Sequence, residues 1–206
     1  MEHRDNYLIQ VQQAKAWFLR YDAQALIRKL KLESDGEYLY TKMLCKPYRI
    51  SLHTGDVQRR EETWVETNNH GEVMTLLDLV CDSREDRFLT GNWENMTTFG
   101  LRFHQNLMGT SADPFARAIQ ENVAGFRRAC GRLEATSAPG GDMAFALELF
   151  DGLKIAIQFW EGDEEFAPRV RYLWDSNALM YLKYETMWFA IGMMQRRILD
   201  EMGNTQ

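Results

Sequence analysis

The chain has 206 residues, of which 45% are hydrophobic and 26% charged, a composition typical of a folded globular protein and unlike that of a disordered one. Its formal net charge of −6 repels phosphate backbones and anionic lipids, so we expect neither nucleic acid nor a membrane as a partner. No uncharged apolar stretch approaches bilayer-spanning length, no signal-peptide core follows Met1, and three widely separated cysteines suit a reducing compartment, so we expect a soluble, cytoplasmic protein.

The N-terminal part is predicted to hold two helices, a group of strands and a third helix. Apolar residues recur at helical spacing in the first helix, at Tyr7, Val11, Ala14, Phe18 and Tyr21. Asp22 is a favourable N-cap for a second, short helix, which Asp35-Gly36 ends. Strand-like runs fill 37–66, and the apolar spacing from Val73 to Val80 indicates a third helix.

The middle of the chain is harder to interpret. Residues 83–112 are predicted to be mostly loop, with a short helix near Leu101–Leu107. Asp113-Pro114 then predicts a helix over 114–128, because Asp is a favoured N-cap and Pro a favoured first helical residue.

Residues 143–160 are predicted to form a β-hairpin. Eight apolar residues alternate with smaller or polar ones, namely Met143, Phe145, Leu147, Leu149, Leu153, Ile155, Ile157 and Phe159. A three-residue loop, Phe150-Asp151-Gly152, with Gly152 in the left-handed conformation, would place all eight on one face. A two-residue turn at Asp151-Gly152 would mix the two faces, so we predict the three-residue loop.

The C-terminal part is predicted to add a strand over Val170–Trp174 and a long helix over residues 185–201. The strands of 37–66 and 143–174 are expected to form an antiparallel sheet of hairpins packed against several helices. The predicted fold is therefore a single α+β domain spanning 1–206, with N-terminal helices in 1–34 and the core in 35–200.

The sequence contains no strong catalytic or metal-binding motif. It has no Cys-x-x-Cys, no His-x-x-x-His, no EF-hand loop and no Gly-x-Ser-x-Gly elbow. Cys130 follows the helix predicted over 114–128, and there the helix dipole would raise a thiol pKa. We therefore assign no catalytic residue, no metal and no cofactor.

The acidic run of residues 161–165 is the most suggestive feature, because the large aromatic residues Trp160 and Phe166 frame it. One interpretation is structural: the aromatics pack into the core while the carboxylates stay in solvent or cap turns. The other is a ligand or partner site, in which arginines at 169 and 171 share one strand face and orient a polar group. The candidate ligand-binding residues are Trp160, Asp163, Glu165, Arg171 and Asp175.

Several stretches carry a resemblance to a known family. The most specific are 159–168 (FWEGDEEFAP), 173–177 (LWDSN) and Tyr181-Leu182, and the upstream ones are 48–52 (YRISL), 55–57 (GDV) and 89–93 (LTGNW). Together they resemble DUF3786, an uncharacterised domain-of-unknown-function family from anaerobic bacteria and archaea, over about residues 22 to 200. Longer members carry an iron–sulfur module with clustered cysteines. This resemblance implies a setting in anaerobic corrinoid-linked or one-carbon redox metabolism, although this sequence lacks the cysteine cluster.

Three functions follow as expectations. The first is an accessory or ligand-binding protein of anaerobic metabolism, acting on a small-molecule or cofactor ligand or on a partner enzyme. The second is a small enzyme using carboxylates among Asp163, Glu164, Glu165 and Asp175. The third is a protein-interaction module without a small ligand.

Overall fold

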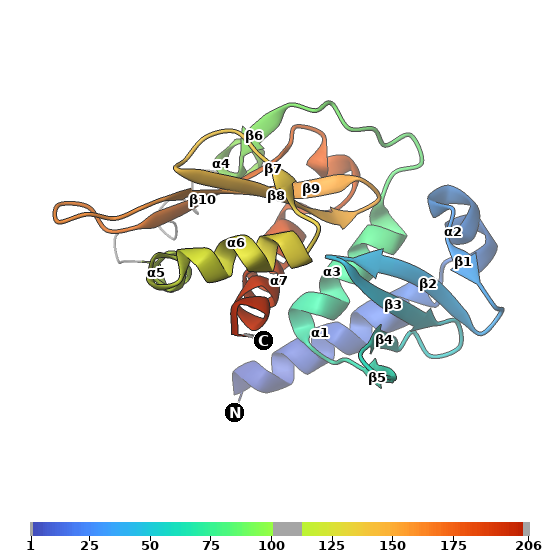
Figure 1. Ribbon diagram of the computed structural model, residues 1–206. Helices are drawn as coiled ribbons and strands as arrows, with labels where there is room; N and C mark the ends of the chain where they lie inside the picture. Colours follow the sequence, from blue (N-terminus) through green and yellow to red (C-terminus); the bar gives the residue numbers. More distant parts are fainter. Residues whose placement is uncertain (1, 101–112, 204–206) are drawn as a thin grey trace. The chain divides into compact units, whose positions relative to one another are not determined.

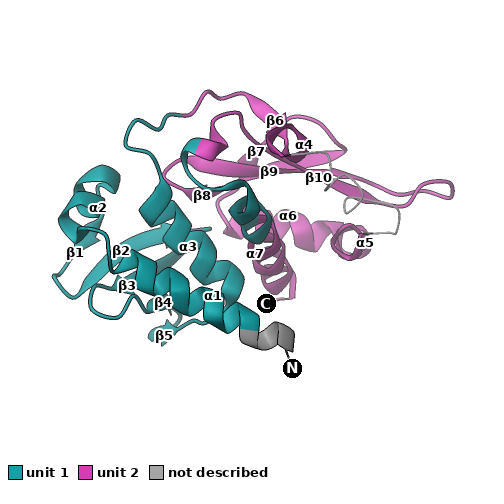
Figure 2. Ribbon diagram, turned by 180° about the vertical axis from the view of Figure 1, so that it is seen from behind, with its two compact units in different colours: residues 1–88, 180–190 teal, residues 89–179, 191–206 magenta. Residues whose placement is uncertain are grey.

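The computed structural model describes residues 2–100 and 113–203 (Figure 1). The chain divides into two compact units, residues 1–88 with 180–190 and residues 89–179 with 191–206 (Figure 2). Each unit holds one antiparallel sheet of five strands together with helices, so the expected α+β class is confirmed. The two groups of predicted strands form two separate sheets, where a single sheet was expected. That residues 1–206 form one domain stays a prediction.

The sheet of unit 1 is an antiparallel meander in the order β1-β2-β3-β4-β5 (Figure 1). Its strands are β1 (Glu33–Ser34), β2 (Tyr38–Met43), β3 (Lys46–Ser51), β4 (Val57–Arg60) and β5 (Trp64–Glu66). Leu44 and Cys45, with φ of 47° and 61°, form the two-residue turn between β2 and β3. Pro47 consequently lies near the start of β3, paired with Lys42.

Two of the helices of unit 1 begin at favourable N-caps. The helices of this unit are α1 (Glu2–Phe18), α2 (Ala23–Leu30), α3 (His70–Asp82) and the first residues of α7 (Tyr184–Gly203). The Asp22 side chain accepts the Gln24 N–H at 2.9 Å at the start of α2, as the sequence predicts. Asn69 caps α3 in the same way, accepting the Glu72 N–H at 3.1 Å.

The sheet of unit 2 has the order β6-β10-β9-β8-β7. Its strands are β6 (Trp93–Asn95), β7 (Thr136–Ser137), β8 (Met143–Phe150), β9 (Leu153–Trp160) and β10 (Arg169–Asp175). The predicted hairpin register is confirmed from Met143 to Glu148, with Met143 opposite Phe159, Phe145 opposite Ile157 and Leu147 opposite Ile155. These residues form one apolar face.

The hairpin turn itself differs from the prediction. Phe150 pairs with Leu153, so Asp151 and Gly152 form a two-residue turn with φ of 49° and 80°. The irregularity lies between Glu148 and Phe150, on β8. Because a bulge there takes up one residue, the two-residue turn and the aligned apolar faces are compatible. The three-residue loop was therefore wrong, although the positive φ of Gly152 was right.

The helices of unit 2 are α4 (Met96–Phe99), α5 (Pro114–Glu121), α6 (Val123–Arg132) and the remainder of α7, and the chain also forms a short 3-10 turn (Ala178–Met180). The Asp113 side chain accepts the Phe115 N–H at 2.9 Å, which confirms the predicted cap. The single helix predicted over 114–128 is wrong, because it is interrupted at Asn122, whose φ and ψ are −144° and 61°. Asn122 then caps α6 by accepting the Gly125 N–H at 2.9 Å. The helix expected near Leu101–Leu107 lies outside the described residues.

None of the helices within residues 2–100 and 113–203 is long and apolar enough to cross a membrane.

Candidate functional site

A cavity of about 480 Å³ lies within unit 1, between α1, α3 and the first turns of α7. Small-molecule sites in proteins commonly have volumes of roughly 300–1,000 Å³ and mostly apolar walls. The apolar lining residues here are Ala14, Trp17, Met74, Leu77 and Phe189. Asp78, Asp82 and Lys183 form the polar part of the wall. The cavity therefore has both the size and the lining of a site for a small organic molecule.

Helical spacing places the two aspartates of this wall together. Asp78 and Asp82 are four residues apart on α3, so their side chains lie on the same face of the helix. Asp78 Oδ2 accepts the backbone N–H of Lys183 at 2.9 Å, which holds the segment before α7 against α3. The Lys183 ammonium lies 3.1 Å from Asp78 Oδ1 and donates to Asp82 Oδ2. We call these three residues the Asp78–Asp82–Lys183 cluster.

The two carboxyl groups of the cluster have different affinities for protons. Burial, reinforced by the hydrogen-bonding contact with Asp82, raises the pKa of Asp78 above its ordinary value. Burial also acts on Asp82, but hydrogen bonds with Asp78 and Lys183 outweigh it and lower the pKa of Asp82. Pairs of carboxyl groups whose pKa values are driven apart are typical of functional sites. Asp78 therefore takes up a proton more readily than Asp82 does.

A chain of hydrogen bonds links the cluster to α1. The Trp17 indole N–H donates to the Tyr21 hydroxyl at 3.1 Å, and this hydroxyl donates to Asp82 Oδ1 at 3.0 Å. Cys81 also lines the cavity, but burial raises the pKa of its thiol to about 12. The thiolate is the nucleophilic form, so Cys81 is not an activated nucleophile.

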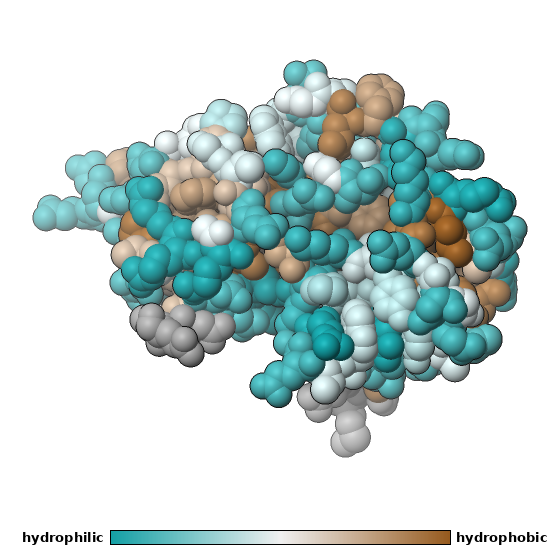
Figure 3. Space-filling model, turned by 45° about the vertical axis from the view of Figure 1, so that its right-hand side comes forward, coloured by the Kyte–Doolittle hydropathy of each residue, from teal (hydrophilic) through white to brown (hydrophobic). Residues whose placement is uncertain are grey.

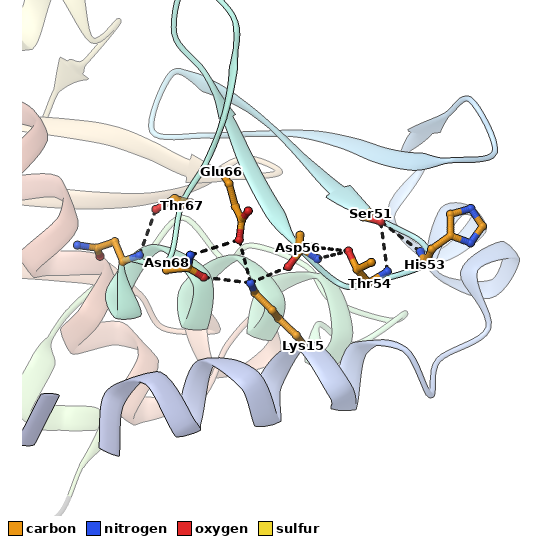
Figure 4. Close-up of polar contacts among 9 residues, drawn as sticks. Lys15, Ser51, His53, Thr54, Asp56, Glu66, Thr67 and Asn68 are labelled. Atoms are coloured by element: carbon orange, nitrogen blue, oxygen red, sulfur yellow. Dashed lines mark hydrogen bonds and ion pairs between the residues drawn. The ribbon is translucent and has the colours of Figure 1, made fainter. Parts of the chain in front are cut away.

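A separate cluster around the buried side chain of Lys15 anchors α1 to the sheet of unit 1. Figure 4 shows the Lys15 side chain reaching from α1 to Asp56, Asn68 and Glu66. The distances from Lys15 Nζ are 2.8 Å to Asp56, 3.0 Å to Asn68 and 3.5 Å to Glu66. The Lys15 side chain is only 4% exposed. Gly55 allows this close approach, since a Cβ there would lie 2.9 Å from the Lys15 carbonyl oxygen.

Glu72 forms a second structural anchor, between α3 and the sheet. Its carboxylate accepts hydrogen bonds from Thr67 at 2.6 Å, Tyr48 at 3.1 Å and Arg59 at 3.0 Å. With these donors the buried charge is well satisfied. The Lys15 and Glu72 clusters therefore account for the packing of α1 and α3, whereas Asp78 and Asp82 face a cavity.

Two of the residues predicted for the site in 160–175 lie together. The guanidinium carbons of Arg169 and Arg171 lie 4.5 Å and 5.3 Å from the centroid of the Trp160 ring. The register explains this contact, because Arg169 is directly opposite Trp160 and Arg171 is opposite Gln158. Both arginines are exposed. Both guanidinium groups stack on the ring of Trp160.

The predicted carboxylates have different surroundings. Asp163 is exposed, and its Oδ1 accepts the N–H groups of Glu165 and Phe166 at 2.9 Å and 2.8 Å. These backbone hydrogen bonds lower the pKa of Asp163. Glu165 is exposed in the same turn. Asp163 thus shapes the loop between β9 and β10.

Asp175 is buried and joins two stretches of the chain. Its carboxylate accepts the N–H groups of Gly91 at 2.7 Å, Thr90 at 3.2 Å and Asn177 at 2.9 Å. The Ser176 N–H donates to the Asn92 carbonyl at 2.9 Å. The stretches 89–93 and 173–177 therefore meet at Asp175.

Comparison with known proteins places the chain in a family. The family model described as "Domain of unknown function (DUF3786)" matches residues 22–197. The chain belongs to this family. No curated protein and no solved structure matches the chain. In this DUF3786 protein the match includes the Asp78–Asp82–Lys183 cluster, whereas α1, which supplies Trp17 and Ala14 to the cavity, precedes it.

The sequence analysis missed all three residues of the cluster. The available signal was the pair Asp78 and Asp82, one helical turn apart in a helix whose other residues are largely apolar. Lys183 carried no such signal. It lies far from α3 in sequence, and only the fold brings it to the pair.

Proposed function

We propose that this DUF3786 protein binds a small organic molecule in the cavity of unit 1. The apolar part of the ligand would contact Leu77, Met74 and Phe189, and its polar group would meet the Asp78–Asp82–Lys183 cluster. The observation that carries the proposal is that a buried carboxyl group, Asp78, and a half-buried one, Asp82, both line a largely apolar cavity of about 480 Å³. Burying Asp78 costs free energy unless something repays it, and a bound ligand does so.

This proposal corresponds to the first function expected from the sequence, an accessory or ligand-binding protein of anaerobic metabolism, and it specifies where the ligand binds. The family resemblance supports an anaerobic setting, linked to corrinoid or iron–sulfur one-carbon metabolism, as part of this proposal. Cys81 and Cys130 are free thiols, which supports a reducing compartment such as the cytoplasm.

A cavity-filling variant tests the proposal. Ala14 lines the cavity, whereas Ala16 is exposed on the same helix. We expect Ala14→Phe to abolish the binding of fragments that the wild-type protein binds in ligand-observed NMR, and Ala16→Phe to leave it unchanged. Equal binding by all three proteins would overturn the proposal, provided that both variants show wild-type circular dichroism and cooperative melting.

A second candidate is an interaction site for an anionic partner in unit 2, within the segment 160–175. The stack of Arg169 and Arg171 on Trp160 favours it, because exposed guanidinium groups held on an aromatic ring bind carboxylates and phosphates well. Asp163 and Glu165, in the adjacent turn, and Asp175 belong to this candidate as the sequence analysis defines it. To test this candidate, the affinity of a poly-glutamate peptide is measured for the wild-type protein and for the double variant Arg169→Ala/Arg171→Ala. We expect the double variant to bind the peptide more weakly, and equal affinities would contradict the candidate.

The third expected function, a protein-interaction module without a small ligand, is not supported by the face of the molecule that Figure 3 shows. Hydrophilic residues cover most of this face, and hydrophobic ones lie in separate small groups. A docking surface for a protein partner is typically a continuous apolar patch of several hundred Å².

A further inference from the structure

We infer that the ligand of the unit 1 cavity carries a protonated amine, which binds between Asp78 and Asp82 in the place that the Lys183 ammonium occupies in this structure. This inference rests on the proposed function and adds the chemical class of the ligand. It is drawn from three features of the cavity, namely an unsatisfied acceptor, the charges of the wall and the exposure of Lys183.

The first feature is the acceptor atom Asp78 Oδ1. The Asp78 side chain is only 6% exposed, and its Oδ1 makes no hydrogen bond, although Oδ2 accepts the Lys183 backbone N–H. Lys183 Nζ lies 3.1 Å from Oδ1, within ion-pair range but without hydrogen-bond geometry. A buried acceptor without a hydrogen bond is costly, so it favours a ligand that donates one.

The second feature is the sign of the charge around the cavity. Three lining residues, Asp78, Asp82 and Glu185, are acidic, and Lys183 is the only basic residue among those that line it. A ligand carboxylate or phosphate would face the two aspartates at close range and be repelled. A cation would be attracted, and the low dielectric of the apolar walls strengthens that attraction.

The third feature is the position of Lys183. Its side chain is 63% exposed, whereas those of Asp78 and Asp82 are 6% and 27% exposed. The ammonium can therefore turn outward into water, while the backbone N–H of Lys183 keeps its bond to Asp78. A ligand amine entering from the cavity would then donate to Asp78 Oδ1 and Asp82 Oδ2. Lys183 acts in this account as an internal competitor of the ligand.

The walls determine the rest of the ligand. Trp17 and Phe189 border the cavity from α1 and α7, and Leu77 and Met74 from α3. These side chains offer no charge to a distant part of the ligand. The fitting class is thus an amine with a compact aromatic or aliphatic body, and a polyamine with several charges fits less well.

Three probes of nearly the same shape test the inference, namely phenethylamine, phenethyl alcohol and phenylpropionate. Binding is followed by the indole N–H resonance of Trp17 in ¹⁵N NMR spectra, since Trp17 lines the cavity. We expect phenethylamine to bind at least about tenfold more tightly than the other two. Asp78→Asn should weaken the amine by about tenfold or more, and Lys183→Met should strengthen it by about tenfold, because the competitor is gone. Asp86→Asn, which changes an exposed carboxylate of the same unit, should have no effect.

The outcomes separate this inference from the proposed function. Binding of the alcohol or of phenylpropionate as tightly as the amine would overturn the cationic class while the cavity remains a binding site. A Lys183→Met protein that binds the amine more weakly would overturn the competition. If none of the three probes shifts the Trp17 resonance at millimolar concentration, the inference fails, and the Ala14→Phe fragment screen decides separately whether the cavity binds anything. Asp78→Asn keeps an acceptor for the Lys183 N–H, so it is expected to fold.

Discussion

Asp78 and Asp82 lie one turn apart on α3, and the pKa of Asp78 is raised while that of Asp82 is lowered. Burial is the largest influence on both carboxyl groups. They differ because the hydrogen bonds to Asp82, including those from Lys183 and Tyr21, stabilise its charged form. Asp78 thus gains a proton at a higher pH than Asp82 does.

The raised pKa of Asp78 predicts a pH dependence of stability. Because its folded pKa lies above the unfolded value of about 4, the folded state binds more protons just above that pH. Stability therefore falls as pH rises from about 4 through the folded pKa. The free energy of unfolding of wild type, relative to Asp78→Asn, should decrease over this range in urea titrations.

Asp86 provides the control for this measurement. Hydrogen bonding and the charge of Arg84 lower the pKa of Asp86, so its contribution to stability is present above the unfolded pKa and is lost as pH falls through the folded one. The difference between wild type and Asp86→Asn should therefore change in the opposite direction. If the Asp78→Asn difference grows with pH, the raised pKa of Asp78 is wrong.

Lys15 is predicted to stabilise unit 1 more than a surface lysine does. Lys15→Met removes the donor to Asp56 Oδ1 and Asn68 Oδ1, and we expect a loss of about 1–3 kcal/mol in the free energy of unfolding. Lys46→Met breaks the more exposed pair with Glu61 and should cost about 0–1 kcal/mol. Equal losses in urea denaturation would show that the Lys15 cluster is not an anchor.

Asp175 and Asp163 should respond differently to the same chemical change. Asp175→Asn places an amide NH₂ among the donors of Gly91, Thr90 and Asn177, and the unsatisfied group should cost about 1–3 kcal/mol. Asp163→Asn keeps the single oxygen that accepts both turn N–H groups, so its effect should stay within about 0.5 kcal/mol. Thermal melting of the two variants measures the contrast. A larger loss for Asp163→Asn would mean that their structural roles are misassigned.

The cap of α5 is the simplest local prediction. Asp113→Ala removes the acceptor of the Phe115 N–H and should lower stability by about 0.5–2 kcal/mol. Asp113→Asn retains an acceptor oxygen and should cost much less. Chemical denaturation of the three proteins distinguishes the cap from a general effect of charge, since both variants lose the carboxylate. If both variants lose a similar amount of stability, the loss of the negative charge, and not of the cap hydrogen bond, would be the cause.

Features that depend on neighbouring residues could be predicted from the sequence. The Asp113-Pro114 cap and the register of the hairpin 143–160 both follow from local spacing, and both are present. The bulge on β8 could not be predicted from the sequence. A three-residue loop without a bulge and a two-residue turn with a bulge both place the apolar residues of the hairpin on one face. The break at Asn122 was missed because the apolar spacing continues across it.

Features that depend on distant residues could not be predicted. Lys15 falls within the apolar stripe of α1 and is buried only because Asp56 and Asn68 meet it there. The cavity is formed by three helices, and Lys183 reaches α3 only through the fold. The acidic segment 161–165 was predicted as part of a site because its charged residues are adjacent in the sequence. Asp78 and Asp82 are four residues apart, and their side chains become neighbours only when the chain forms a helix.

The most direct test of the account is to map the amide resonances of the protein in ¹⁵N NMR spectra as phenethylamine is added. The account predicts that the largest shifts fall on the residues that line the cavity in α1, α3 and the start of α7, such as Trp17, Leu77 and Thr186. Shifts confined to the strands around Trp160 and Arg171 would contradict it and favour the second candidate site.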